Sequence, residues 1–128
     1  MHNSINHIGE DILEDVLISD DAYREYKERI KTIVDRLIPK GILIVADCGK
    51  NNFWGTLGLN NPFAPSIDWK LHWEPWVWKR MIEEIGCSHI RTNWTARREF
   101  GGFGRQFLAN RLCSYFLNSH FVSIFEKD

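Results

Sequence analysis

The chain has 128 residues with a formal net charge of −1, and 44% of its residues are hydrophobic. This length fits a single domain, residues 1–128, and the ordinary hydrophobic fraction excludes a disordered chain. A net charge near zero gives no general reason to expect nucleic acid or an anionic membrane as a partner, and no apolar stretch approaches the ~20 residues that span a bilayer.

The cysteine usage is typical of a reducing compartment. The chain has three cysteines, an odd and widely spaced set that argues against a disulfide framework: Cys48, Cys87 and Cys113. Residues 1–7 have neither a basic start nor an apolar core, so no signal peptide is predicted. We therefore expect a cytoplasmic protein.

The first part of the chain is predicted to be helical. A short apolar stripe at 12–17 is followed by an amphipathic helix that begins after Ser19 and runs to Leu37. Pro39 and Gly41 end this helix in a tight turn.

Residues 41–48 form an unbroken apolar run that ends in Asp47 and Cys48. A strand that is apolar on both faces is typical of the inside of a parallel sheet with both faces covered. Open α/β sheets bind their ligands at the carboxyl ends of such strands. This run therefore predicts an α/β fold with functional groups at the end of the strand.

A long irregular segment, residues 49–73, follows the strand. Segments of this size in compact domains are usually functional or contain short elements of their own. The remaining pattern predicts, in order, a helix that begins at Pro75 and ends near Gly86, a strand at 87–95, a glycine-rich turn at 100–105, a short helix at 107–116 and a final strand at 120–126. In the strand at 87–95, alternation places Ile90, Thr92 and Trp94 on one face.

Three clustered glycines, Gly101, Gly102 and Gly104, resemble a phosphate-binding loop at first sight. A dinucleotide-binding fingerprint, however, follows the first strand of its fold and has an acidic residue about twenty positions later. The glycines here come late in the chain and no such acid follows. The pattern therefore favours a turn.

Thiol and metal chemistry have weak support in the sequence. Cys48 is the best candidate for a nucleophilic thiol, but the pattern favours a small apolar residue beside a pocket. The candidate soft metal ligands are widely separated or isolated, without the closely spaced pair that structural zinc sites usually contain: Cys48, His72, Cys87 and His89. No metal is expected.

The richest local constellation lies at residues 67–78, where an acid and a histidine stand among tryptophans. Asp68 and His72 could form a hydrogen-bonded pair beside aromatic walls, which suits the orientation of a small acceptor or a proton transfer. Alternatively, the tryptophans fix the loop to the domain and His72 is a structural partner. The sequence supports both interpretations equally.

Four segments of the chain, residues 3–10, 39–48, 52–69 and 104–121, are similar in order and spacing to parts of one known family. With His72 and Pro75 following the third segment, the chain resembles the C-terminal half of a class I S-adenosylmethionine-dependent methyltransferase. The resemblance implies a partial Rossmann-like sheet with flanking helices. Its strands would be equivalent to the fifth, sixth and seventh of the family, with the antiparallel last strand between the other two.

The resemblance also implies site residues. Asn6 and His7 would lie near the cofactor, S-adenosyl-L-methionine, and His72 is the candidate catalytic residue. A further set would line the acceptor side: Asp47, Cys48, Phe53, Trp69 and Trp73. The family's main cofactor contacts, a glycine-rich loop after the first strand and an acid after the second, have no counterpart in this chain.

The implied function is the acceptor-side portion of a methyltransferase that acts on a small molecule and is inactive without an N-terminal, cofactor-binding half. The alternative is a non-enzymatic, dimeric binding or assembly module derived from such an enzyme. In either case the strand at 42–46 would have one unpaired edge, which is an association hazard. We therefore expect a homodimer or a complex with a separate N-terminal half.

Overall fold

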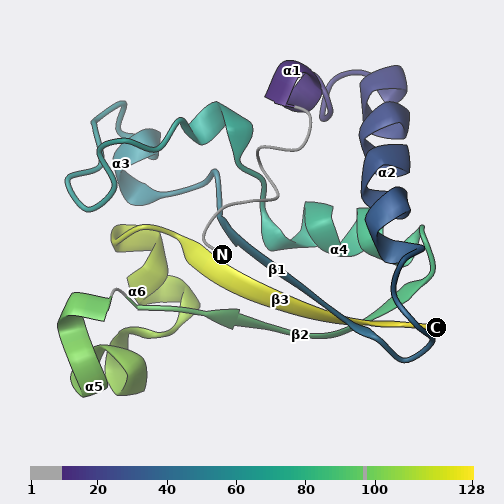
Figure 1. Ribbon diagram of the computed structural model, residues 1–128. Helices are drawn as coiled ribbons and strands as arrows, with labels where there is room; N and C mark the ends of the chain where they lie inside the picture. The colour runs from purple at the N-terminus through teal and green to yellow at the C-terminus, as the bar shows by residue number, and fades with distance from the viewer. Residues whose placement is uncertain (1–9, 97) are drawn as a thin grey trace.

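The computed structural model describes residues 10–96 and 98–128, and it has the mixed α/β architecture that the sequence predicts (Figure 1). Three strands form one open antiparallel sheet: β1 (Ile42–Cys48), β2 (Cys87–Trp94) and β3 (His120–Lys127). The two longest helices lie on the same face of this sheet, and the hydrophobic core fills the space between them and the strands.

The strand order is β1-β3-β2, and β3 is antiparallel to both of its neighbours. The register pairs Ile44 with Ile124 on one side of β3 and Thr92 with Ser123 on the other. β1 and β2 therefore run in the same direction on either side of the last strand. The last strand thus lies between the other two, as the sequence resemblance implies, but all the pairings in this sheet are antiparallel, whereas a Rossmann-like sheet is mainly parallel.

β1 differs from its prediction in its surroundings. The sequence predicts a strand inside a parallel sheet, but within the described residues β1 pairs only with β3 and lies at the sheet edge. Val45 and Asp47 are fully buried under the helices, whereas Ile42 and Ile44 are 48% and 60% exposed on the other face. The prediction was wrong because an apolar run shows which side chains can be buried, not whether a second covering layer is present.

Helices occupy most of the remaining described chain. None of them is long and apolar enough to cross a membrane. Their bounds, including three short 3-10 or π turns, are α1 (Glu10–Leu13), α2 (Asp20–Val34), α3 (Phe53–Thr56), η1 (Trp69–Leu71), α4 (Pro75–Glu83), η2 (Arg98–Phe100), α5 (Gly101–Phe103), η3 (Gly104–Leu108) and α6 (Arg111–Phe116).

α2 forms where the sequence predicts it, although it ends at Val34 instead of Leu37. The hydroxyl of Ser19 caps its first turn by accepting a hydrogen bond from the Ala22 N–H at 3.3 Å. Tyr26, Ile30 and Val34 recur every four residues and form its buried stripe. This stripe faces α4, which begins at Pro75 as predicted and buries its own apolar residues against the sheet.

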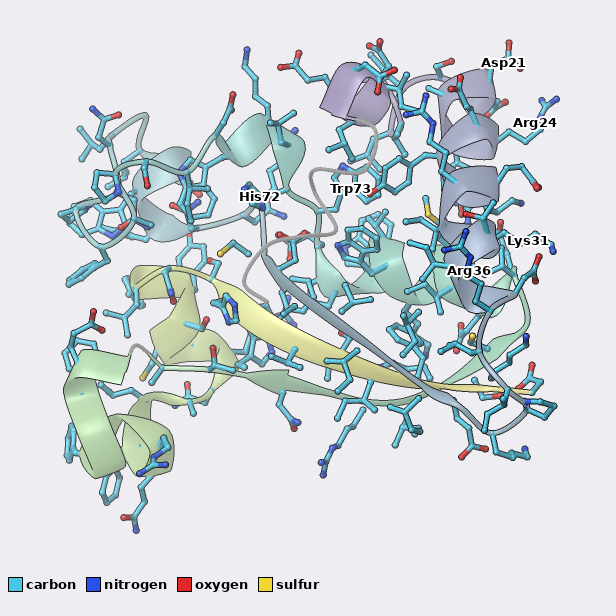
Figure 2. All side chains as sticks on the ribbon, in the orientation of Figure 1. Asp21, Arg24, Lys31, Arg36, His72 and Trp73 are labelled. Atoms are coloured by element: carbon cyan, nitrogen blue, oxygen red, sulfur yellow. The ribbon has the colours of Figure 1, made fainter. Side chains whose placement is uncertain are left out.

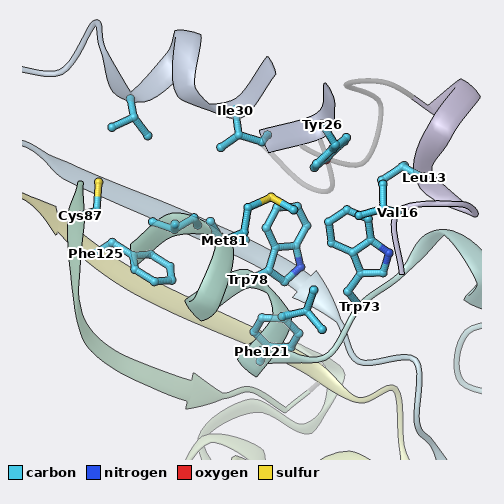
Figure 3. Close-up of a cluster of buried hydrophobic side chains, with 14 residues drawn as sticks. Leu13, Val16, Tyr26, Ile30, Trp73, Trp78, Met81, Cys87, Phe121 and Phe125 are labelled. Carbon is cyan, nitrogen blue, oxygen red and sulfur yellow. The ribbon is translucent and has the colours of Figure 1, made fainter. Parts of the chain in front are cut away.

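The core contains unusually large side chains for a small sheet (Figure 3). Trp73 lies 4.9 Å from both Tyr26 and Trp78, measured between ring centroids, and Phe121 and Phe125 cover the sheet beneath them. Burial of each large apolar side chain contributes about 1.5–3 kcal/mol, so this cluster dominates the stability of the domain.

A bulge between His89 and Arg91 interrupts the pairing of β2 with β3. Thr92 and Trp94 lie opposite Ser123 and Phe121 on the core face, as their alternation predicts. Ile90, which the sequence places on that same face, is 51% exposed because the extra residue in the bulge breaks the alternation.

The predicted glycine-rich turn is helical instead. Residues 98–108 form η2, α5 and η3 in succession. Gly104 is buried, and a Cβ at this position would collide with the Cβ of Phe100. Close packing therefore explains this glycine, and no phosphate-binding loop is needed to account for it.

Candidate functional site

The candidate site lies at the carboxyl end of β1 and is centred on the Asp47 carboxylate. Asp47 is fully buried. Its Oδ1 accepts a hydrogen bond from the Cys48 N–H at 2.7 Å and lies 2.6 Å from Nδ1 of His72. Its Oδ2 accepts a hydrogen bond from the Trp78 indole N–H at 2.9 Å. A buried carboxylate requires this kind of donor set, because removal from water is costly unless hydrogen bonds replace the solvent.

Two parts of the chain outside β1 carry the side-chain partners of Asp47. His72 and Trp73 lie on the segment between η1 and α4, next to the end of β1 (Figure 2). Trp78 belongs to the buried stripe of α4 and reaches the same carboxylate from within the core. The Asp47–His72–Trp78 network therefore joins the strand, the irregular segment and the helix at one point.

The contact with Asp47 fixes the orientation and tautomer of His72. An ionised carboxylate only accepts hydrogen bonds, so Nδ1 of the imidazole is the donor. In the neutral ring, Nε2 then carries the basic lone pair. A histidine held in this way by a buried carboxylate is a common arrangement for a general base, since the carboxylate also stabilises the imidazolium that forms.

The pairing of His72 with Asp68, one of the two interpretations that the sequence left open, does not form in the structure. Asp68 is the N-cap of η1, and its side chain accepts a hydrogen bond from the Lys70 N–H at 3.1 Å. An aspartate at this position commonly accepts a hydrogen bond from its own turn in this way. The partner of His72 is Asp47, which lies 25 residues earlier in the chain.

The two tryptophans that the sequence places on the acceptor side lie in different environments. Trp69 is half-buried, and its ring centroid is 6.1 Å from that of His72. Trp73 is only 1% exposed and packs among Tyr26 and Trp78 in the core. Trp69 is therefore the aromatic neighbour of His72, and Trp73 is part of the core next to the site.

Cys48 follows Asp47 directly and is buried. Burial, together with the negative charge of Asp47, raises the pKa of its thiol to about 12. A thiol in this environment is protonated at neutral pH and is a poor nucleophile. This finding agrees with the interpretation of Cys48 as a small apolar residue beside the site.

Phe53 lies in a second aromatic cluster. Its ring centroid is 5.0 Å from that of Phe116 and 6.4 Å from that of Tyr115, both in α6. The neighbouring Trp54 donates its indole N–H to the Phe116 carbonyl at 2.8 Å. The interactions described for Phe53 thus connect α3 with α6, at the far end of the irregular segment from His72.

Other candidate residues have simple outcomes. Asn6 and His7, the candidate cofactor contacts, lie outside the described residues. Within the described residues, no group of three or more histidine, cysteine, aspartate or glutamate side chains could hold a metal ion.

Sequence reasoning missed two contributors to the site. Trp78 is a hydrogen-bond donor to Asp47 as well as a core residue. A tryptophan on the buried stripe of a helix, together with an acid at the end of a buried strand, is the sequence signal that could have indicated this hydrogen bond. Glu74 accepts a hydrogen bond from the Asn51 N–H at 2.7 Å and lies against Gly49. It anchors the chain as it leaves β1.

A separate cleft of about 290 Å³ lies beside the start of α2, where Tyr23, Trp76 and Arg80 line part of its wall. It contains none of the site residues that the sequence predicts.

Searches of family models, curated proteins and solved structures find no match to this chain.

Proposed function

We propose that the chain forms the acceptor-side portion of a class I S-adenosylmethionine-dependent methyltransferase that acts on a small molecule. The observation that carries the proposal is the Asp47–His72 contact at the carboxyl end of β1, where the sequence resemblance places the acceptor. The strand order, with antiparallel β3 between β1 and β2, supports a Rossmann-like sheet of the methyltransferase type.

The role of His72 is to accept a proton from the acceptor. A hydroxyl or amine that is to be alkylated must lose a proton, and Nε2 of His72 is the basic nitrogen that receives it. Asp47 stabilises the resulting imidazolium, and Trp69 provides an aromatic wall beside it. An acceptor that needs no deprotonation would use His72 only for orientation.

The described residues do not fit S-adenosylmethionine by themselves. β1 is followed by Gly49, but the Glu74 carboxylate occupies the space next to it. The clustered glycines late in the chain are helical, and Gly104 packs against Phe100. The proposal therefore assigns cofactor binding to a separate N-terminal half, and catalysis requires that half because the methyl donor must be held in line with the acceptor.

The test is complementation. The chain is co-produced with a glycine-rich N-terminal methyltransferase half, for which any in-frame sequence upstream of Met1 is the natural source. Calorimetry should detect S-adenosylmethionine binding to the assembled protein, and isotopically labelled methyl groups should pass to a small-molecule acceptor in a panel of acids, phenols and amines. An assembled protein that does not bind the cofactor would overturn the proposal.

Two variants separate catalysis from scaffolding in that assembled protein. We expect His72→Ala to lower turnover by roughly 10²–10⁴-fold with little change in cofactor affinity, which is the range of general-base catalysis. His89→Ala is the matched control, because His89 is partly buried and hydrogen-bonded to Thr92 at 2.9 Å, outside the Asp47 network. Unchanged turnover in His72→Ala, or an equal loss of turnover and cofactor affinity, would contradict the role of His72.

A non-enzymatic binding module is the second candidate function. It is favoured by the burial of His72, which is only 7% exposed, within a network that also stabilises the domain. Under this interpretation, substitution of His72 lowers the stability of the domain and the assembled protein transfers no methyl groups.

A further inference from the structure

The two edges of the sheet differ in their protection against association. β2 has a bulge between His89 and Arg91, and polar residues such as Ser88 and Asn93 are exposed along it. A bulge and polar or charged side chains are the usual devices that prevent an edge strand from pairing with another chain. The β2 edge is therefore protected.

β1 has none of these devices. It continues for seven residues without a proline or a bulge, and its register with β3 is uninterrupted. Its one charged residue, Asp47, is turned into the core, where it contacts His72 and Trp78. Alternate N–H and C=O groups of an edge strand point away from its partner, so β1 presents a regular, apolar template to a further strand.

The uncovered face beside this edge is largely apolar. Ile42 and Ile44 are 48% and 60% exposed; Ile44 lies opposite partly buried Ile124 of β3, and Ile42 lies opposite Glu126. α2 and α4 cover only the opposite face of the sheet (Figure 1). Within residues 10–96 and 98–128, β1 pairs only with β3, and exposed branched side chains beside such an edge are typical of an interaction surface.

We propose that β1 is a homodimer interface, in which the β1 strands of two copies pair antiparallel about a two-fold axis at Ile44. A second copy fits because the strand is self-complementary. This register places Ile44 beside its own symmetry mate, Ile42 beside Ala46, and Leu43 beside Val45, so no charged residues face each other in 42–46.

The neighbouring register brings the one charged residue of the strand into the pairing. If the axis passed through Val45, Asp47 would lie opposite Leu43 of the second copy. The register about Ile44 keeps Asp47 outside the paired residues 42–46. It produces one continuous sheet with the helices of both copies on one side and the exposed isoleucines of both copies together on the other.

Sedimentation equilibrium of the chain alone tests the interface. We expect a mass of twice 15.1 kDa. Ile44→Lys, which replaces an exposed side chain, should raise the dimer dissociation constant by roughly 100-fold or more, because it places two positive charges at the axis. Ile90→Lys is the matched control, since Ile90 is 51% exposed at the opposite edge of the same sheet, and it should leave the dimer intact.

Cross-linking tests the register. In a Cys113→Ser background, oxidation of Ile44→Cys should join the two copies by a disulfide, because directly opposed residues of antiparallel strands lie within disulfide range. Ile90→Cys should not cross-link. A dimer in which Ile44→Cys fails to cross-link would overturn the register about Ile44.

A wild-type chain that remains a monomer at its highest soluble concentration would overturn the interface, and so would a dimer that Ile90→Lys dissociates and Ile44→Lys does not. A monomer that becomes a one-to-one complex with an N-terminal methyltransferase half would instead identify that half as the occupant of the edge. Since these measurements use no cofactor, the result for the dimer is independent of the result for methyl transfer.

Discussion

Oδ1 of Asp47 lies 2.6 Å from Nδ1 of His72, and this contact joins the end of β1 to the long irregular segment that follows it. Trp78 of α4 binds the other oxygen of the same carboxylate. A single buried charge therefore orients a candidate base and also holds three parts of the chain together. Substitutions in this network should affect stability even where no substrate is present.

Asp47→Asn should destabilise the domain by about 1–3 kcal/mol, because the new amide group cannot accept the hydrogen bonds of His72, Trp78 and the Cys48 N–H together. Urea unfolding measures the effect. Asp68→Asn is the control: Asp68 is exposed, and asparagine caps a turn equally well, so its effect should stay below about 0.5 kcal/mol. Equal losses in the two variants would contradict the assignment of Asp47 as the partner of His72.

Trp78→Phe and Trp73→Phe form a second matched pair. Both tryptophans are 1% exposed in the same cluster, but the indole of Trp78 donates to Asp47, whereas Trp73 has no side-chain hydrogen bond to the described part of the chain. Both variants lose similar apolar volume. We expect Trp78→Phe to lower the free energy of unfolding in urea by about 1.5–3 kcal/mol more than Trp73→Phe does, which is the usual contribution of a hydrogen bond to a charged group. A smaller loss for Trp78→Phe than for Trp73→Phe would show that this hydrogen bond contributes little.

The main elements could be predicted from the sequence because their signals are local. Ser19 with the stripe of Tyr26, Ile30 and Val34 specifies α2 within one segment, and Pro75 begins α4 in the same way. The exposure of Ile42 and Ile44 could not be predicted, because it depends on which elements pack against the sheet. The face of the sheet on which Ile90 lies was predicted wrongly, because the position of a bulge cannot be read from the alternation of side chains in the sequence.

The candidate site was predicted only in part. Asp47 and His72 were both recognised, Asp47 from its place at the end of an apolar strand and His72 from its tryptophan-rich surroundings. Their pairing was missed because sequence proximity favoured Asp68, whereas the real contact spans 25 residues and depends on how the irregular segment returns to the sheet. Trp78 was interpreted as packing alone, since its indole N–H needs a partner that only the tertiary structure provides.

Cys48 should be the thiol that resists modification despite its position at the candidate site. Burial and the charge of Asp47 raise its pKa to about 12, so at pH 8 its thiolate fraction is roughly 10⁻⁴. Cys113 is only partly buried and should react first with iodoacetamide in the native protein. Mass spectrometry of the alkylated peptides gives the order, and urea-unfolded protein is the control in which both cysteines should react. Labelling of native Cys48 as fast as Cys113 would show that the strand end opens readily to solvent.

Glu84 should make the domain sensitive to acid. Its carboxylate lies 3.0 Å from Nζ of Lys27 and 3.1 Å from Nε of Arg80, and the hydrogen bond from Lys27 is the main cause that lowers its pKa below the ordinary value of 4.5. A carboxyl group with a lowered pKa in the folded state stabilises the fold above the unfolded value, and this stabilisation is lost as the pH falls through the folded value. The side chain is 33% exposed, so we expect a screened contribution of about 0.5–1 kcal/mol. Urea unfolding measures the free energy of unfolding at pH 7 and at pH 3. The difference between these two free energies should be smaller in Glu84→Gln than in the wild type, and Lys27→Gln should show the same reduction. If Glu84→Gln kept the full wild-type difference in unfolding free energy, the acid-sensitive group would be a residue other than Glu84.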